Sequence, residues 1–325
     1  MLRDWLSRLG PVKTESAGWY MSGSSVASAI AIPGPTPDDP ITIRYLSDII
    51  AGPNDIAPAL ARQSSELGVQ RVPGTLVLPP EMYNFTLIEK PDVPETDVRE
   101  ALRWQLSDQL DFPPEEASYD SFPLPRSASP NKSMLFVAAT RTTRVAAVLK
   151  QLDEQGLRIQ HIDILEMALR NISATLYPES DQAVAVLRMT PSAGVINISR
   201  GNELFLSRRL AAVPNTLGDA AWESYRDRLL VQVQRSIDYY ESTLGQPHCN
   251  ALLVAVTHGW QERVADYLAE ALSLPVRSMP ADLQENHVVE RSGETTDPFT
   301  AAVAGLPAIG GALRSRLVSL ERAVA

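Results

Sequence analysis

The predicted strands and helices occur in the same order in both halves of the chain, and this repeat constrains the fold more than any other feature of the sequence. In the first half, β-prone runs separated by turns between residues 18 and 46 predict a three-stranded meander, followed by a helix at 54–67 and a strand at 75–79. The corresponding elements of the second half are strands at 183–189, 193–199 and 203–210, a long helix at 222–244 and a strand at 251–256. Two similar lobes are therefore expected.

Each lobe has the order strand, strand, strand, helix, strand, helix, which predicts an α/β fold of duplicated βββαβα lobes. We divide the 325 residues into an N-terminal peptide at 1–15, a first lobe at 16–176 and a second lobe at 177–325. A small α+β subdomain is inserted in the first lobe at about 80–133, and the lobe resumes with a strand at 134–140. Actin, Hsp70 and the sugar kinases have this two-lobed architecture and bind a nucleotide between the lobes.

The inserted subdomain is predicted to contain one helix that leads into one strand between residues 92 and 124. Asp92 and Glu95 have the spacing of a capping box at the start of this helix, and Pro113–Pro114 ends it. The apolar residues on one helix face predict packing on a sheet, and they are Val98, Ala101, Leu102, Leu106 and Leu110. Trp104 lies toward the opposite face, so it packs either on a second element of the subdomain or on a partner outside the chain.

The first ten residues predict a short amphipathic helix. Leu2, Trp5, Leu6 and Leu9 recur at helical spacing, with cationic residues among the polar positions. Trp and Leu side chains enter the headgroup region of a membrane while cations face it, although so short a helix is a weak anchor. This peptide is therefore a candidate contact for lipid, for the body of the protein or for a neighbouring chain.

Composition excludes several functional classes. A formal net charge of −10 and a pI of about 5.0 argue against a nucleic-acid partner, because phosphate binding needs a basic surface. The single cysteine, Cys249, excludes an internal disulfide and a thiolate metal cluster, and the scattered histidines predict no metal site. No apolar run reaches the roughly 18 residues of a membrane-spanning helix, which favours a cytoplasmic protein.

Five stretches of the chain carry a resemblance to a known family. They are EALRWQLSDQLDFPPEEASYDSFPL, LFVAATRTTRVAAVLKQLDEQGLRIQHIDILEMALRNI, GNELFLSRRL, LLVQVQRSIDYYESTLG and DPFTAAVAGLPAIGGALR. In order and spacing they resemble the PilM/MshI family of actin-like cytoplasmic proteins in type IV pilus assembly, and more distantly the cytoplasmic domain of the type II secretion protein GspL. The resemblance implies a scaffold at the inner membrane, with an MshI-like protein of a mannose-sensitive haemagglutinin (MSHA) pilus as the preferred member.

The resemblance also implies a partner. In this family a bitopic PilN-like membrane protein offers its cytoplasmic N-terminal peptide to a groove between the inserted subdomain and the first lobe, where apolar anchors or strand addition would hold it. The aromatic candidates are Trp104, Phe112, Tyr119 and Phe122, of which at least half are expected to belong to the core. The polar side of the long helix faces either solvent or a second copy of the chain, so a homodimer stays open.

The nucleotide-binding turns of this family are altered here. The first phosphate turn corresponds to Tyr20–Ser25, which keeps Gly23, Ser24 and Ser25 but lacks the aspartate that would organise Mg²⁺. The second corresponds to Leu187–Gly194, which holds no carboxylate and in which Pro191 lacks an amide proton. The adenosine loop corresponds to Thr257–Trp260, in which Gly259 remains and Trp260 would fill the space of a purine.

Two hypotheses follow from these losses. In the first, the chain is a non-catalytic scaffold that needs no cofactor, and its vestigial nucleotide site comprises Gly23, Ser24, Ser25, Arg188, Gly194 and Gly259. In the second, Arg188 replaces the missing cation, and the chain is an ATP-binding switch or weak ATPase of the same machinery that uses ATP and Mg²⁺. Asp163 at the crossover between lobes fits a helix N-cap without catalysis.

Overall fold

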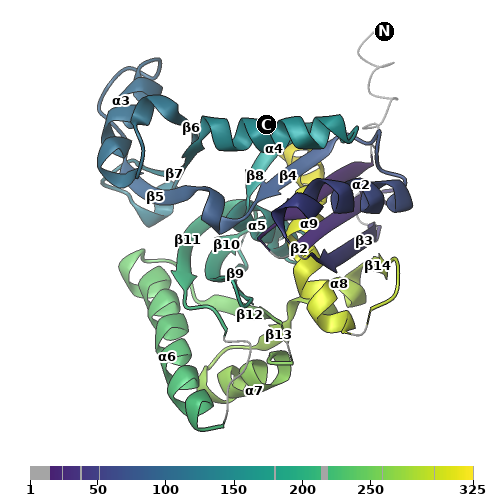
Figure 1. Ribbon diagram of the computed structural model, residues 1–325. Helices are drawn as coiled ribbons and strands as arrows, with labels where there is room; N and C mark the ends of the chain where they lie inside the picture. The colour runs from purple at the N-terminus through teal and green to yellow at the C-terminus, as the bar shows by residue number, and fades with distance from the viewer. Residues whose placement is uncertain are drawn as a thin grey trace, which may run out of the picture.

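The computed structural model describes residues 15–324 apart from 24, 37–38, 51, 179–180, 214–218, 258 and 296, and it describes no side chain at 53, 219–221 or 315–324. Three sheets, of six, five and three strands, organise this part of the chain (Figure 1). The two larger sheets form the centres of the two lobes, and the three-stranded sheet belongs to the inserted subdomain at the upper left of Figure 1. The N-terminal residues Leu2, Trp5, Leu6 and Leu9 lie outside the described residues.

The first-lobe sheet begins with the predicted meander. Its strands are β1 (Ser16–Met21), β2 (Ser25–Ile32), β3 (Thr42–Ile49), β4 (Gly74–Leu78) and β8 (Ile159–Ile164), with β4 and β8 parallel to β1. Successive side chains of β1 enter different cores, because a strand points alternate residues to opposite faces. Trp19 packs with the residues of α2 (Ile56–Leu67) and α4 (Thr142–Glu154), whereas Tyr20 packs with α9 (Pro298–Val324). Helices on both faces therefore bury β1 completely.

The second-lobe sheet repeats this arrangement. Its order is β11-β10-β9-β12-β13, from Glu203–Leu210, Gly194–Arg200, Ala183–Met189, Cys249–Val256 and Val276–Ser278. Helices α6 (Asp219–Asp238) and α7 (Gln261–Ala271) share one apolar core with this sheet, and α6 continues into a π-helical turn at Tyr239–Thr243. The predicted long helix is confirmed, and it buries one apolar stripe that consists of Trp222, Tyr225, Leu229, Val233, Ile237 and Tyr240.

Two helices fill the space between the large sheets. Helix α5 (Leu165–Leu176) packs along α9, and both contribute to one core that also contains residues of the two sheets. Glycines permit this close packing: a Cβ added to Gly18 would lie 2.0 Å from the carbonyl oxygen of Ala308, and one added to Gly310 would lie 2.1 Å from that of Ala168. Helix α9 is therefore in direct backbone contact with β1 and with α5.

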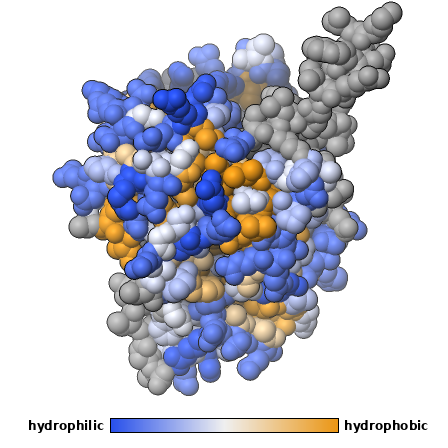
Figure 2. Space-filling view, turned by 90° about the vertical axis from the view of Figure 1, so that its right-hand side faces the viewer, coloured by the Kyte–Doolittle hydropathy of each residue, from blue (hydrophilic) through white to orange (hydrophobic). Residues whose placement is uncertain are grey.

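The last part of the chain returns to the first lobe. After α8 (Met279–Asn286), strand β14 (Val288–Arg291) pairs in parallel with β3, and α9 covers β1, β2 and β4. Neither α8 nor β14 was predicted from the sequence, and residues 177–325 were all assigned to the second lobe. A strand of four residues carries too little periodicity to reveal its pairing. Figure 2 shows the side that lies on the right in Figure 1, where apolar surface occurs in patches between hydrophilic residues.

The inserted subdomain contains a complete antiparallel sheet in the order β5-β7-β6, from Asn84–Glu89, Met134–Arg141 and Ala117–Pro123. Two details correct the sequence analysis: β5 was not predicted, and the strand at 134–140 is the central strand of this sheet rather than a first-lobe strand. Side chains of β7 fill both faces, because Leu135 and Val137 pack under helix α3 while Phe136 enters the core of the second lobe. Both faces of β7 are therefore buried, one against α3 and the other against the second-lobe core.

Helix α3 (Val98–Leu106) is shorter than predicted. Asp92 and Glu95 do not cap it, since Glu95 instead pairs with Lys90 at 2.5 Å and a turn from Pro94 to Asp97 precedes the helix. A short 3₁₀ turn at Ser107–Gln109 ends the helical region before the prolines. Val98, Leu102 and Leu106 are buried as predicted, whereas the side of the helix opposite to them leaves Trp104 65% exposed.

Within the described chain, no helix combines the length and apolar character that crossing a bilayer requires.

Candidate functional site

A groove of about 640 Å³ separates the inserted subdomain from the first lobe. Residues 118–122 of β6 and 138–140 of β7 line one side, while α4, the end of β8 and the first turns of α5 line the other. We call it the β6–β8 groove. Its walls are two outer strands, because β6 ends the order of the small sheet and β8 ends that of the first-lobe sheet. The backbone groups on the open side of an outer strand are available to an added extended peptide.

The β6–β8 groove is mainly apolar. Leu78, Ala138, Val145, Leu149 and Met167 line it, and they belong to or pack against the first-lobe core. Ile162 projects from β8 into this lining and is 41% exposed, which is unusual for an apolar side chain on a strand that borders a core. A partner with apolar side chains would bury Ile162 together with this lining.

One part of the groove carries charge. Arg314 of α9 forms an ion pair with the buried Asp163 of β8 at 3.1 Å, and Arg170 of α5 also lines the groove. Burial raises the pKa of the Asp163 carboxyl, and the Arg314 guanidinium opposes this shift. Asp163 is not the N-cap of α5 that the sequence analysis expected. Ile164 holds that position, and the Asp163 carboxylate accepts a hydrogen bond from the Ile164 amide instead.

The structure brings two of the four predicted partner residues to this groove. Tyr119 and Phe122 line it, although Tyr119 is largely buried and donates a hydrogen bond to the Arg99 carbonyl at 2.6 Å. Trp104 projects from the outer side of α3 and is not part of the lining. Phe112 is not part of the lining either, and the Arg141 guanidinium lies 4.7 Å from the centre of its ring. The sequence analysis missed Ile162, whose position on an outer strand is set by the order of the whole sheet.

A buried arginine joins the lobes where the resemblance placed a nucleotide. The guanidinium of Arg188 on β9 lies 5.7 Å from the centre of the Tyr20 ring on β1, and it donates to the Val303 carbonyl at 3.4 Å. Arg188 is only 4% exposed, and burial lowers its pKa, which Tyr20 opposes. Its guanidinium therefore interacts with an aromatic ring and a backbone carbonyl of the first lobe.

A backbone hydrogen bond closes each of the two predicted phosphate turns. Ser22 donates its amide to the Ser25 carbonyl at 2.8 Å, and the two hydroxyls lie 2.8 Å apart. In the second turn the Thr190 amide donates to the Ala193 carbonyl at 2.8 Å. Gly23 is exposed and Gly194 is the first residue of β10, while Ser24 lies outside the described residues.

The predicted adenosine loop is occupied by aromatic packing. Trp260 is buried and stacks on Trp222 with 5.4 Å between ring centres, and the Arg263 guanidinium lies over both rings. Gly259 precedes it with a φ of 71°, a conformation that glycine adopts without strain. Trp260 therefore packs in the second-lobe core, between α6 and α7.

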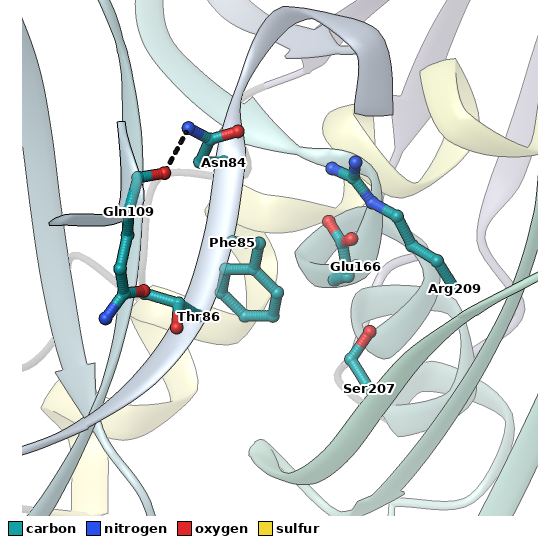
Figure 3. A pocket seen from close by; sticks show the side chains of 7 residues that line it. All are labelled: Asn84, Phe85, Thr86, Gln109, Glu166, Ser207 and Arg209. Carbon is teal, nitrogen blue, oxygen red and sulfur yellow. Dashed lines mark hydrogen bonds between the residues drawn. The ribbon is translucent and has the colours of Figure 1, made fainter. Parts of the chain in front are cut away.

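A polar cluster that was not identified from the sequence joins three parts of the chain, and Figure 3 shows two of its members, the buried Glu166 and the more exposed Arg209. Glu166, in the first turn of α5, accepts a hydrogen bond from the Tyr83 hydroxyl, which in turn accepts one from the Leu165 amide at 3.3 Å. Arg209 of β11 donates to the carbonyls of Pro80 at 2.8 Å and Tyr83 at 3.0 Å. Glu166 is 1% exposed, and burial raises its pKa. This cluster fixes the start of the inserted subdomain to both lobes.

Among the described residues, no group of three histidine, cysteine, aspartate or glutamate side chains is placed to hold a metal ion.

Comparison with solved structures found several chains of similar fold. A PilM–PilN type IV pilus biogenesis complex is 19% identical, with a TM-score of 0.63 over 94% of this chain and 99% of that chain. The cytoplasmic domain of EpsL, an inner-membrane component of the type II secretion system of Vibrio cholerae, is 11% identical, with a TM-score of 0.48 over 94% of this chain and 95% of that one. A Bacteroides thetaiotaomicron protein with an actin-like ATPase fold is 13% identical, with a TM-score of 0.49 over 84% of this chain and 95% of that one.

No family model and no curated protein matches the sequence. At 19% identity, the likeness to the PilM–PilN complex establishes the fold alone. The two-lobed, actin-like α/β fold expected from the sequence is thereby confirmed, with its duplicated three-strand meanders and its inserted subdomain.

Proposed function

We propose that this chain is a cytoplasmic, non-catalytic actin-like scaffold of a type IV pilus assembly platform at the inner membrane, and that it binds the cytoplasmic N-terminal peptide of a PilN-like membrane protein. An MSHA-type pilus is the system that the sequence resemblance favours. The likeness to a structure of a PilM–PilN complex supports the proposal at the level of fold. The β6–β8 groove provides the place for the peptide.

The observation that carries this proposal is the geometry of the β6–β8 groove. Two outer strands border an apolar channel, and the partly exposed Ile162 lies in its wall. An extended peptide in this channel would pair its backbone with β6 or β8 and bury alternate side chains against the apolar lining. Affinity would then come from main-chain hydrogen bonds, and specificity from the fit of the side chains.

The non-catalytic part of the proposal rests on the space between the lobes. Arg188 and Tyr20 make a buried contact between the lobes, and one backbone hydrogen bond closes each hairpin, from Ser22 to Ser25 and from Thr190 to Ala193. Neither turn carries an aspartate that could hold Mg²⁺ beside a phosphate group. The second candidate function, an ATP-binding switch, is favoured by one observation. Arg188 is a cation two residues before Thr190, and its partner Tyr20 lies two residues before Ser22.

The proposal is tested by isothermal titration calorimetry, in which the purified chain is titrated with the N-terminal peptide of the PilN-like protein from the same organism. Ile162→Glu should weaken binding about tenfold or more, because it places a charge in the apolar lining. Val288→Glu is the matched control, since Val288 is 47% exposed on β14, the other outer strand of the same sheet. Equal affinity of the two variants would remove the β6–β8 groove as the peptide site, and no binding by the wild type would reject the partner.

A further inference from the structure

The small sheet has a second open side, which faces the second lobe. Its outer strand β5 lies opposite β11, the outer strand of the second-lobe sheet, and two cavities of about 410 Å³ and 220 Å³ lie between these strands. Both cavities are lined by Phe85, Thr86 and Ser207, so they adjoin, and we call the two together the β5–β11 groove. Figure 3 shows β5 and β11 on either side of the first cavity. The small sheet thus presents each of its two edges to an edge of a large sheet.

The chemistry of this groove changes along its length. The first cavity is polar, with Asn84, Gln109, Ser207 and Arg209 in its lining (Figure 3). The second is apolar, with Leu87, Leu124, Phe136, Phe205 and Leu244 in its lining. Leu87 is 38% exposed, although its neighbours on both sides of the groove belong to a core. A ligand that fills both cavities needs a polar part and an apolar part.

Two arginines and one buried carboxyl are the charged or ionisable side chains of the lining. Arg208 and Arg209 are successive residues of β11, and the wall formed by β5 carries no charge. The carboxyl that lines the groove belongs to Glu166, which is buried and bonded to Tyr83. Arg209 uses one terminal nitrogen for the Pro80 and Tyr83 carbonyls, and Arg208 lies over the Tyr239 ring at 4.8 Å. Two fixed guanidinium groups in a chain of net charge −10 favour an anionic ligand.

We propose that the β5–β11 groove binds an extended acidic peptide segment of a partner protein, separate from the peptide in the β6–β8 groove. The segment lies between the two outer strands and adds its backbone to one of them. An aspartate or glutamate of the segment faces Arg208, apolar side chains contact Leu87 and Phe136 in the same cavity, and a polar or acidic side chain at the other end reaches Arg209. The inserted subdomain then holds two peptides, one on each edge of its sheet.

The test uses a phage-displayed library of random octapeptides, selected on the purified full-length chain. The enriched peptides should combine an acidic residue with apolar residues, and synthetic copies should bind by fluorescence polarisation. Leu87→Glu and Arg208→Glu should each weaken this binding about tenfold or more. The matched controls are Val231→Glu and Arg228→Glu, exposed positions on α6 outside the groove, which should bind within about twofold of the wild type.

Circular dichroism and melting temperature establish that each variant is folded. The proposal is overturned if selection enriches no acidic peptide, or if the enriched peptides bind the groove variants and the control variants equally. Ile162→Glu separates this site from the one assigned to the PilN-like peptide: acidic peptides in the β5–β11 groove bind it like the wild type. Loss of their binding in Ile162→Glu alone would place them in the β6–β8 groove and reject a second site.

Discussion

The Arg188 guanidinium lies 5.7 Å from the centre of the Tyr20 ring, so a central strand of the second lobe contacts a central strand of the first. Both residues are almost fully buried, at 4% and 3% exposed. Burial raises the pKa of Tyr20, so its hydroxyl stays neutral beside the cation at ordinary pH. The contact ties the lobes together without a ligand.

ATP with Mg²⁺ should not stabilise this chain. A ligand at 100 times its dissociation constant stabilises a protein by about 2.7 kcal/mol, which a thermal shift measurement detects readily. Because Arg188 is held by Tyr20 and the Val303 carbonyl, we expect no shift in melting temperature and no saturable heat in calorimetry. Saturable binding in the micromolar range would establish the ATP switch instead.

Arg188→Ala should lower the free energy of unfolding by roughly 1–3 kcal/mol, because it removes a buried cation–π contact and leaves the Val303 carbonyl without this donor. Urea denaturation measures the change. Arg228→Ala is the control, since Arg228 is exposed on α6 and should change stability by less than about 0.5 kcal/mol. If the two variants are equally stable, the contact between Arg188 and Tyr20 does not hold the lobes together.

Trp104→Ala should leave both folding and groove binding unchanged. Trp104 is 65% exposed and does not line the β6–β8 groove, so its loss should cost less than about 0.5 kcal/mol and leave the affinity for the PilN-like peptide as it is. Trp19→Ala provides the contrast: Trp19 is fully buried and donates to the Ser64 hydroxyl at 2.8 Å, so its loss should cost about 3–5 kcal/mol. A weaker peptide complex with Trp104→Ala would extend the binding surface to α3.

Glu166→Gln should change how stability depends on pH. Burial raises the pKa of Glu166 in the folded chain, so the folded state holds this proton more tightly than the unfolded state. Its stabilising contribution is complete below the pKa of the unfolded chain, about 4.3, and is lost as pH rises through the higher folded value. The variant keeps an acceptor for the Tyr83 hydroxyl but cannot ionise.

Urea denaturation of both proteins at about pH 5 and about pH 8 measures this effect. The free energy of unfolding of the wild type should fall relative to that of the variant as pH rises, so the difference, variant minus wild type, should increase. Asp163 shifts in the same direction in both proteins, so it cancels from the comparison. A difference that does not depend on pH would show that Glu166 titrates as an ordinary glutamate.

Local sequence signals predicted most elements of the two lobes. The meanders and the long helix follow from hydrophobic periodicity and turn chemistry, and the structure confirms them. The position of β7 could not be predicted in this way, because its run of apolar residues is equally suited to either sheet. Strand β5 was not predicted for a similar reason. It is partly exposed and follows Pro79–Pro80, and its apolar and polar residues alternate only weakly.

The candidate site depended more on tertiary structure. Tyr119 and Phe122 were identified because they are aromatic and lie in the inserted subdomain, and they do line the β6–β8 groove. Ile162 could not be recognised, because IQHIDI does not reveal which strand becomes the outer one. Glu166 was hidden in the same way, since its partners Tyr83 and Arg209 are 83 and 43 positions away in the sequence.

Hydrogen exchange tests the central claim, that a peptide of the PilN-like protein adds to the small sheet or to the first-lobe sheet in the β6–β8 groove. Exchange is followed by mass spectrometry on the full-length chain, with and without saturating peptide. We predict slower amide exchange in Ala117–Pro123 or Ile159–Ile164. Exchange should be unchanged in the opposite outer strands of the same two sheets, Asn84–Glu89 and Val288–Arg291. Unchanged exchange in both β6 and β8 when peptide is bound would contradict the account.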